Sequence, residues 1–309
     1  LLRSLRREGA RLIDAHFAYP DGEAATRLGR WFDLPVTITL RGTEVPHSRN
    51  PSLRPRMVRA LQAAARVFSV SDSLRRLALE LGVAADKTEV VGNGVDTRVF
   101  QPEDQAAARV KLGLPAHARI LISVSGLVER KGMHRVIDCL PALLQQHPDL
   151  LYLIVGSGGP EGDMCAELDA QVRRLGLSGH VHFLGALPPE ELKWPLSASD
   201  VFVLATRNEG WANVFLEAMA CGLPVITTDV GGNAEVVCRD ELGSIVPFGD
   251  AAALQQALDA ALGRAWNRAA IVEYAQANQW DKRVAQLQQA FDSVLSSASA
   301  PNQAAPVKP

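Results

Sequence analysis

Short apolar runs alternate with amphipathic helical segments along most of this chain. After residue 118, apolar runs typical of buried strands lie at 119–125, 151–156, 180–185, 201–205, 224–228 and 244–248. A segment with helical periodicity follows each run, for example at 133–146 and 251–262. Because buried strands joined by helices form parallel sheets, these residues are predicted to form a complete doubly wound α/β domain.

The same alternation is shorter before residue 100, where strand-like runs lie at 11–16, 36–40, 66–71 and 88–91. The predicted fold class is α/β with two Rossmann-like domains, at 1–102 and 103–280, and a linker at 101–104. The first domain is expected to be incomplete, because four strands are few and the chain does not begin with Met. Residues 280–297 read as an amphipathic helix and 298–309 as a disordered tail. The apolar face of that helix is predicted to hold Val284, Leu287, Phe291 and Val294.

Composition and charge exclude some classes of protein but do not identify the function. The chain has 309 residues and a net charge of −2, so no strong field favours nucleic acid. Its four cysteines are widely spaced, without a CxxC pair, which is typical of reduced thiols in the cytosol. No apolar run reaches transmembrane length, and the start does not read as a signal peptide.

The segment that follows the strand-like run at 201–205 carries the densest candidate chemistry. Glu209 lies in a predicted loop, and Glu217 lies in the helix that comes next. The start of that helix offers unpaired N–H groups and the positive end of the helix dipole, which together bind anions. A phosphate there would lie between two carboxylates that can accept hydrogen bonds from hydroxyl groups. This arrangement suits a nucleotide sugar.

The whole run, which ends in Glu-Ala-Met-Ala-Cys-Gly-Leu-Pro-Val, resembles the E-x7-E signature of family 4 of the retaining glycosyltransferases. The resemblance implies the GT-B fold, in which two Rossmann-like domains face each other across a cleft. It also implies that residues 281–297 cross back to the first domain and that the second domain binds the donor. The donor-binding residues implied in this run are Glu209, Gly210, Trp211, Ala212, Asn213, Val214 and Glu217.

Residues 123–132 resemble the family's G-R-L-x-x-x-K-G segment, whose Arg and Lys hold the diphosphate. Lys131 matches the Lys, Gly126 occupies the Arg position, and Arg130 is the candidate replacement cation. The positive end of the helix dipole slightly disfavours a lysine at a helix start. A lysine at this position is therefore better explained by phosphate binding than by simple solvation. The resemblance also assigns the backbone near Leu187 to the nucleobase. Glu161 occupies the position where a dinucleotide fingerprint needs its third glycine, which argues against an oxidoreductase.

The first strand ends in a segment that resembles the family's H-A-H-x-x-x-P pattern. His16 matches the second His, which faces the donor sugar, and Asp14 replaces the first. A satisfied histidine at a strand end is the alternative. Residues 39–44 resemble a T-x-[RH]-G-[ST]-[DE] run, which puts Arg41 and Gly42 on the acceptor side. Residues 41–66 form a basic segment that suits an anionic acceptor or a lipid surface as well as a solvated helix face. Its arginines are Arg41, Arg49, Arg54, Arg56, Arg59 and Arg66, against one acid, Glu44.

These motifs predict a retaining glycosyltransferase that moves a sugar from a nucleoside-diphosphate sugar to a glycan, lipid or small-molecule acceptor. The predicted catalytic residues are His16, Lys131 and Glu209. No cofactor is expected, and no metal, because the sequence has no Asp-x-Asp motif. The expected location is the cytoplasm, with peripheral contact between residues 41–66 and the inner face of the membrane. The alternatives are a nucleotide-sugar-binding module without transfer activity and a nucleotide-sugar epimerase of the same architecture.

Overall fold

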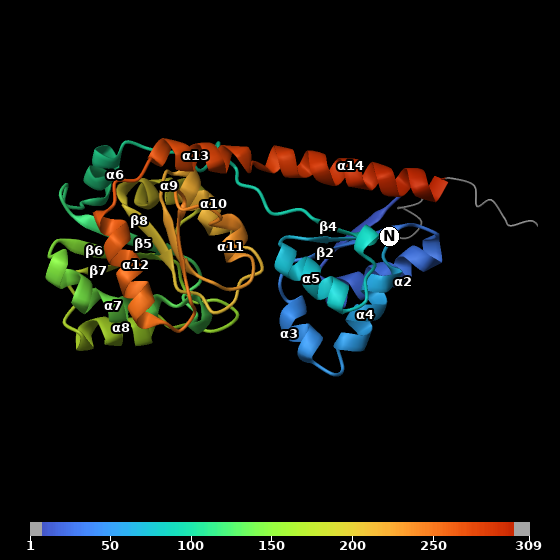
Figure 1. The fold of residues 1–309 in the computed structure, drawn as a ribbon, viewed down its shortest axis with the longest axis horizontal. Coiled ribbons are helices and arrows are strands. Elements are labelled where there is room, and N and C mark those ends of the chain that lie inside the picture. The colour runs from blue at the N-terminus through green and yellow to red at the C-terminus, as the bar shows by residue number, and fades with distance from the viewer. Residues whose placement is uncertain (1–7, 300–309) are drawn as a thin grey trace, which may run out of the picture. The chain divides into compact units, whose positions relative to one another are not determined.

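The computed structural model describes residues 8–299, which form two compact units (Figure 1). Residues 8–92 and 281–299 make the first unit, and Asn93–Trp280 make the second. The division falls before the linker that the sequence placed at 101–104. The physical reason is that Val95 is already part of the second unit, since its amide donates to the carbonyl oxygen of Asn278 at 3.1 Å.

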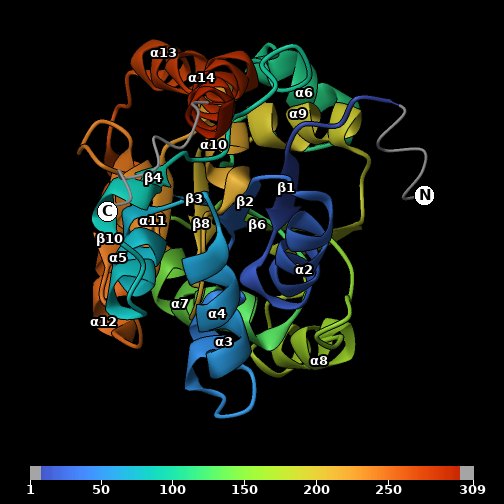
Figure 2. The same ribbon diagram turned by 90° about the vertical axis from the view of Figure 1, so that its right-hand side faces the viewer.

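The first unit contains a parallel sheet in the order β1-β2-β3-β4, which confirms the four predicted strands. The helices α2 and α5 pack against this sheet, α2 on β1 and β2, and α5 on β3 and β4 (Figures 1 and 2). The strands and α-helices before residue 92 are β1 (Ile13–His16), α2 (Glu23–Phe32), β2 (Val36–Leu40), α3 (Glu44–Arg49), α4 (Arg54–Ala63), β3 (Arg66–Ser69), α5 (Asp72–Glu80) and β4 (Thr88–Val90).

The C-terminal helix α14 (Trp280–Ser299) completes the first unit. Ala290 on this helix joins Phe68 and Val91 in a buried cluster, with Leu287 and Phe291 packed beside it. Val284 differs from the prediction, because 46% of it is exposed. The helix also runs two residues into the segment predicted to be disordered, and the rest of that tail, 300–309, lies outside the described residues.

The second unit contains a parallel sheet in the order β10-β9-β8-β5-β6-β7, and its strands match the six predicted runs closely. One group of helices is formed by α7, α8 and α12, and the other by α6, α9, α10 and α13 (Figure 1). The strands are β5 (Arg119–Val124), β6 (Leu150–Val155), β7 (Val181–Gly185), β8 (Val201–Leu204), β9 (Val225–Thr228) and β10 (Gly243–Val246). The helices are α6 (Gln105–Leu112), α7 (Met133–Gln146), α8 (Cys165–Arg174), α9 (Pro189–Ala198), α10 (Asn213–Ala220), α11 (Asn233–Val236), α12 (Ala251–Gly263) and α13 (Arg268–Ala277).

The order of the second sheet reverses between β5 and β8. The chain moves outward from β5 through β6 to β7, then returns to the other side of β5 and continues through β8, β9 and β10. In open parallel sheets, ligands bind outside the carboxyl ends of the two strands where the order reverses. The topology therefore points to the loops that follow β5 and β8.

The aromatic contact between α14 and β3 generates a stability prediction. The rings of Phe68 and Phe291 meet edge to face, with centroids 5.8 Å apart. Phe291→Ala should lower the free energy of unfolding of the first unit by about 2 kcal/mol, because a partly buried ring leaves a cavity. Hydrogen exchange of the β3 amides in a denaturant series would measure the loss. Val284→Ala on the same helix is the control, and an equal loss in both variants would contradict this packing.

Candidate functional site

The loops after β5 and β8 approach each other closely at the sheet's carboxyl edge. The two strands are parallel neighbours, and the amide of Arg207 donates to the carbonyl oxygen of Arg130 at 2.7 Å. Gly132 has φ +81°, and a Cβ atom there would overlap the carbonyl oxygen of Ala205. Only glycine accommodates both the backbone conformation and this close approach.

Lys131 and Glu209 form the central ion pair of these loops. Lys131 Nζ lies 2.6 Å from Glu209 Oε1. The same oxygen accepts a hydrogen bond from Thr206 Oγ1 at 3.1 Å and lies 3.4 Å from Arg130 Nη1. Glu209 is only 9% exposed, so two cations and a hydroxyl compensate a carboxylate that is largely withdrawn from water. The structure thus brings together three residues that the sequence singled out.

Arg130 also contacts a carboxylate that the sequence did not connect with it. Its Nε and Nη2 atoms donate to the two oxygens of Glu161 at 2.5 and 2.8 Å. This bidentate contact lowers the pKa of Glu161 and raises that of Arg130. Glu161 lies in the loop after β6, and β6 is the neighbour of β5. The sheet order could have indicated the contact, whereas residue spacing could not.

Helix α10 begins next to this ion pair. Ala212 at its N-cap carries no side-chain acceptor, so the first-turn amides are left without a side-chain cap. Asn213 accepts a hydrogen bond from Asn93 Nδ2 at 2.7 Å. Burial raises the pKa of Glu217, in the middle of the helix, to about 7. A partly buried carboxylate of this kind favours partners that donate hydrogen bonds to it.

The remaining predicted residues of the second unit either pack against its apolar core or lie in its loops. Trp211, Val214 and Leu187 pack against its core, and Gly210 lies in the loop before α10. The indole nitrogen of Trp211 is buried and has no hydrogen-bond partner among the described residues. Gly126 has open surroundings, since an added Cβ would meet only the carbonyl oxygen of Ser157 at 3.9 Å. The backbone there leaves room for a side chain, and Arg130 is the second cation, after Lys131, that the structure brings to Glu209.

The first unit contains its own cluster at the carboxyl ends of β1 and β2. Arg41 Nε donates to His16 Nδ1 at 2.9 Å, and His16 Nε2 lies 3.6 Å from an oxygen of Asp14. Phe17, the next residue, has φ +69°, which is strained for a residue with a side chain. Its amide donates to the carbonyl oxygen of Thr39 at 2.9 Å, which helps to hold this conformation.

Glu44 fixes this cluster in place, a role that its motif did not reveal. Its carboxylate accepts from the amides of Ala18, Arg41 and Gly42 at 2.9, 3.1 and 2.8 Å. The residue is only 1% exposed, so these bonds replace its hydration. The carboxylate thus joins the loop after β1 to the loop after β2. Gly42 has φ +128°, a backbone conformation that favours glycine.

The basic segment 41–66 is less uniform than its sequence suggests. Arg56 pairs with Glu23 at 2.6 Å, and Arg66 pairs with Glu89 at 3.1 Å. Acids outside the segment therefore neutralise part of its charge. The sequence could not indicate this, because Glu44 is the one acid within the segment.

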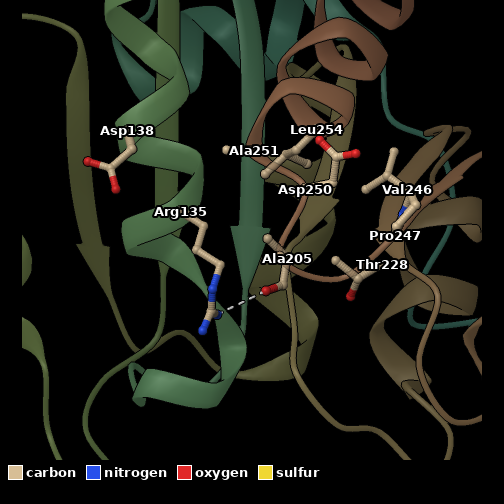
Figure 3. Close-up of a pocket in the computed structure, with 10 residues that line it drawn as sticks. Arg135, Asp138, Ala205, Thr228, Val246, Pro247, Asp250, Ala251 and Leu254 are labelled. Carbon is tan, nitrogen blue, oxygen red and sulfur yellow. Dashed lines mark hydrogen bonds between the residues drawn. The ribbon is translucent and has the colours of Figure 1, made fainter.

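A separate cavity of about 200 Å³ lies at the ends of β8, β9 and β10 (Figure 3). Arg135 on α7 lines it and donates to the carbonyl oxygen of Ala205 at 3.2 Å. Thr228 and Val246 lie on its opposite side (Figure 3). The cavity does not include the Lys131–Glu209 pair, so it is distinct from the predicted donor-binding residues.

Metal-binding clusters and membrane-spanning helices are both absent from residues 8–299. Within that range, no three His, Cys, Asp or Glu side chains gather closely enough to hold a metal ion. None of the helices described there has both the length and the apolar character needed to cross a membrane.

Gly231 generates a prediction about the position of Glu209. It has φ +55°, and a Cβ there would collide with the carbonyl oxygen of Glu209. Gly231→Ala should cost at least about 1–2 kcal/mol of stability and displace the Glu209 loop. Thermal unfolding and a crystal structure of the variant would measure both effects. Gly159→Ala, where an added Cβ meets nothing within 4 Å, is the matched control. An unchanged midpoint in Gly231→Ala would disprove the constraint.

Comparison with known proteins places this geometry in a family. The sequence model of "Glycosyl transferases group 1" matches residues 104–278, and that of "Glycosyltransferase Family 4" matches residues 1–99. The chain is 30% identical to a D-inositol 3-phosphate glycosyltransferase of Corynebacterium urealyticum over 304 residues, which cover 92% of this chain and 71% of that protein.

Solved structures agree on the architecture. Sucrose-phosphate synthase from Thermosynechococcus elongatus is 27% identical with a TM-score of 0.79, over 96% of this chain and 76% of that one. Anabaena HepE, solved in complex with UDP, is 24% identical with a TM-score of 0.84, over 94% and 80% of the two chains, which supports the fold alone. The predicted fold class, with two Rossmann-like domains, is thereby confirmed. The chain belongs to the glycosyl transferases group 1 family and is a glycosyltransferase of the GT-B fold.

Proposed function

We propose that this glycosyltransferase moves a sugar, with retention of configuration, from a nucleoside-diphosphate sugar to an acceptor hydroxyl. The observation that carries the proposal is the Lys131–Glu209 pair at 2.6 Å, where the order of the second sheet reverses. A cation and a carboxylate at this position can hold a diphosphate and a sugar hydroxyl side by side.

In this proposal each part of the donor has a partner in the second unit. The diphosphate binds Lys131, Arg130 and the uncapped amides at the start of α10. Glu217 accepts hydrogen bonds from the ribose hydroxyls, and Glu209 accepts from the transferred sugar. The nucleobase lies against the backbone near Leu187. UDP, which HepE binds, is the first nucleotide to test.

The proposed reaction is a displacement on the front face of the sugar. The bond between the anomeric carbon and the leaving phosphate oxygen breaks, and the acceptor oxygen bonds to the same face. The leaving phosphate takes the acceptor proton. Lys131 and the helix start stabilise the charge that develops on this phosphate, which supplies the role that a metal has in other sugar transferases.

The acceptor side is proposed to lie in the first unit. His16 faces the donor sugar there, and Arg41 and Gly42 border the acceptor, which is a glycan, a lipid-linked sugar or a small molecule. Asp14 and Arg41 contact His16 from two sides, which supports a fixed imidazole rather than a free one. We further propose a cytoplasmic enzyme that touches the membrane's inner face through residues 41–66, with Arg49, Arg54 and Arg59 as the contacting cations.

Lys131→Ala tests the diphosphate assignment. It should weaken binding of the best of UDP, GDP and ADP by about 1.5–3 kcal/mol, the range for a hydrogen bond to a charged group. Calorimetric titration measures this change. Lys111→Ala, which removes a lysine on α6 that lies 3.9 Å from Glu191, should leave the affinity unchanged. Equal affinities for the wild type and Lys131→Ala would refute the assignment.

Glu217 should make donor binding depend on pH. Its pKa is about 7, and ribose hydroxyls donate to its ionised form, so affinity should rise as the pH increases from about 6 to about 8. The gain should reach about tenfold, since that pH change converts most of the carboxyl to carboxylate. Titration with UDP-glucose and GDP-mannose suits this test, because their diphosphates do not titrate in this range.

Two variants make the pH test specific to Glu217. Glu217→Gln should remove this rise with pH, because an amide does not ionise. Glu209→Gln should keep the rise while weakening binding of the sugar-bearing donor. A rise of the same size in Glu217→Gln would assign it to another group.

A further inference from the structure

Arg130 and Lys131 are each paired with a carboxylate of the chain itself. Lys131 pairs with Glu209, and Arg130 bonds both oxygens of Glu161. Two cations and two carboxylates sum to zero, whereas the diphosphate of a nucleotide sugar carries two negative charges. A diphosphate gains more from either cation when the carboxylate paired with that cation yields its place, because both anions are attracted to the same group.

The two carboxylates differ in how firmly they are held. Glu209 is 9% exposed and is bonded by Thr206 and Lys131. The Glu161 side chain is 55% exposed and makes its bonds to Arg130 alone among the described residues. Glu161 can therefore leave by a change of rotamer, with little loss of packing.

The turn that carries Glu161 explains why it reaches Arg130. Gly159 and Gly162 exchange backbone hydrogen bonds of 2.8 and 3.0 Å, which leaves Pro160 and Glu161 at the tip of a tight turn. Gly162 has φ +134°, which favours glycine. The turn projects Glu161 toward the loop after β5. Its partner there, Arg130, lies 31 residues earlier in the chain.

We infer that Glu161 is an internal competitor that occupies Arg130 in exchange with the donor diphosphate. The inference rests on the proposed function, since it requires a diphosphate at this site. Glu161 weakens nucleotide binding, and after transfer it takes Arg130 back from the product diphosphate. It is a positioning residue that favours product release, a step that limits turnover in many enzymes.

Glu161→Gln tests the competition, because it removes the charge and keeps the size of the side chain. The variant should bind the best of UDP, GDP and ADP about two- to fivefold more tightly than the wild type, as expected for release of a partly exposed ion pair. Calorimetric titration gives the affinity, and stopped-flow displacement should show slower nucleotide dissociation.

Glu129→Gln is the matched control for a general change in charge. Glu129 lies next to Arg130 in the loop after β5 and is similarly exposed, but it pairs with Arg135 and Arg207 at 2.7 and 2.9 Å. Its removal should leave nucleotide affinity unchanged. Arg130→Gln supplies the second control, because Glu161→Gln should have no effect on affinity in that background if Glu161 acts through Arg130.

The outcomes separate this inference from the proposed function. If the wild type binds nucleotide and Glu161→Gln binds equally or more weakly, the competition is wrong and the proposed function stands. The competition is also wrong if tighter binding persists in the Arg130→Gln background or appears equally in Glu129→Gln. Failure of the wild type to bind UDP, GDP and ADP would overturn the proposed function and this inference with it.

Discussion

The site depends on the parallel pairing of β5 with β8. Residues 121 and 122 face 201 and 202 across this pair, although about 80 residues separate them along the chain. Parallel strands end at the same edge of a sheet, so the loops that follow these two strands must meet. Arg130, Lys131 and Glu209 are neighbours for this reason. Gly132 and Gly231 allow the close backbone approaches that fix the geometry.

The loops hold charges that would be costly elsewhere. Glu209 is compensated by Lys131, Arg130 and Thr206, whereas burial raises the pKa of Glu217 to about 7. A carboxylate with a raised pKa lowers stability as the pH rises from about 4.5 to 7, since the folded state holds its proton more tightly than the unfolded state. Such a cost is typical of a functional residue.

In the first unit, one buried carboxylate holds the loops of the cluster together. Glu44 gathers three backbone amides and so joins the loops that carry His16 and Arg41. The strained φ of Phe17 lies in the same region and is held by hydrogen bonds to the neighbouring strand. In both units, local conformations that an isolated segment would avoid are maintained by strands that pair at a distance in sequence.

The sequence by itself determined the fold class, every strand of the two described sheets and the family. Apolar runs reveal buried parallel strands directly, and the run around Glu209 and Glu217 carries the family signature in consecutive residues. The contact between Arg130 and Glu161, the amides gathered by Glu44 and the pairing of Arg56 with Glu23 could not be predicted in this way. Each joins segments that only strand order and helix packing bring together. The tertiary structure also leaves Val284 exposed, although it precedes Phe291 by seven residues and so shares its face of α14, because the cluster around Phe68 packs against Leu287, Ala290 and Phe291 and not against Val284. Periodicity defines a helix face, but the partner surface decides how much of that face is buried.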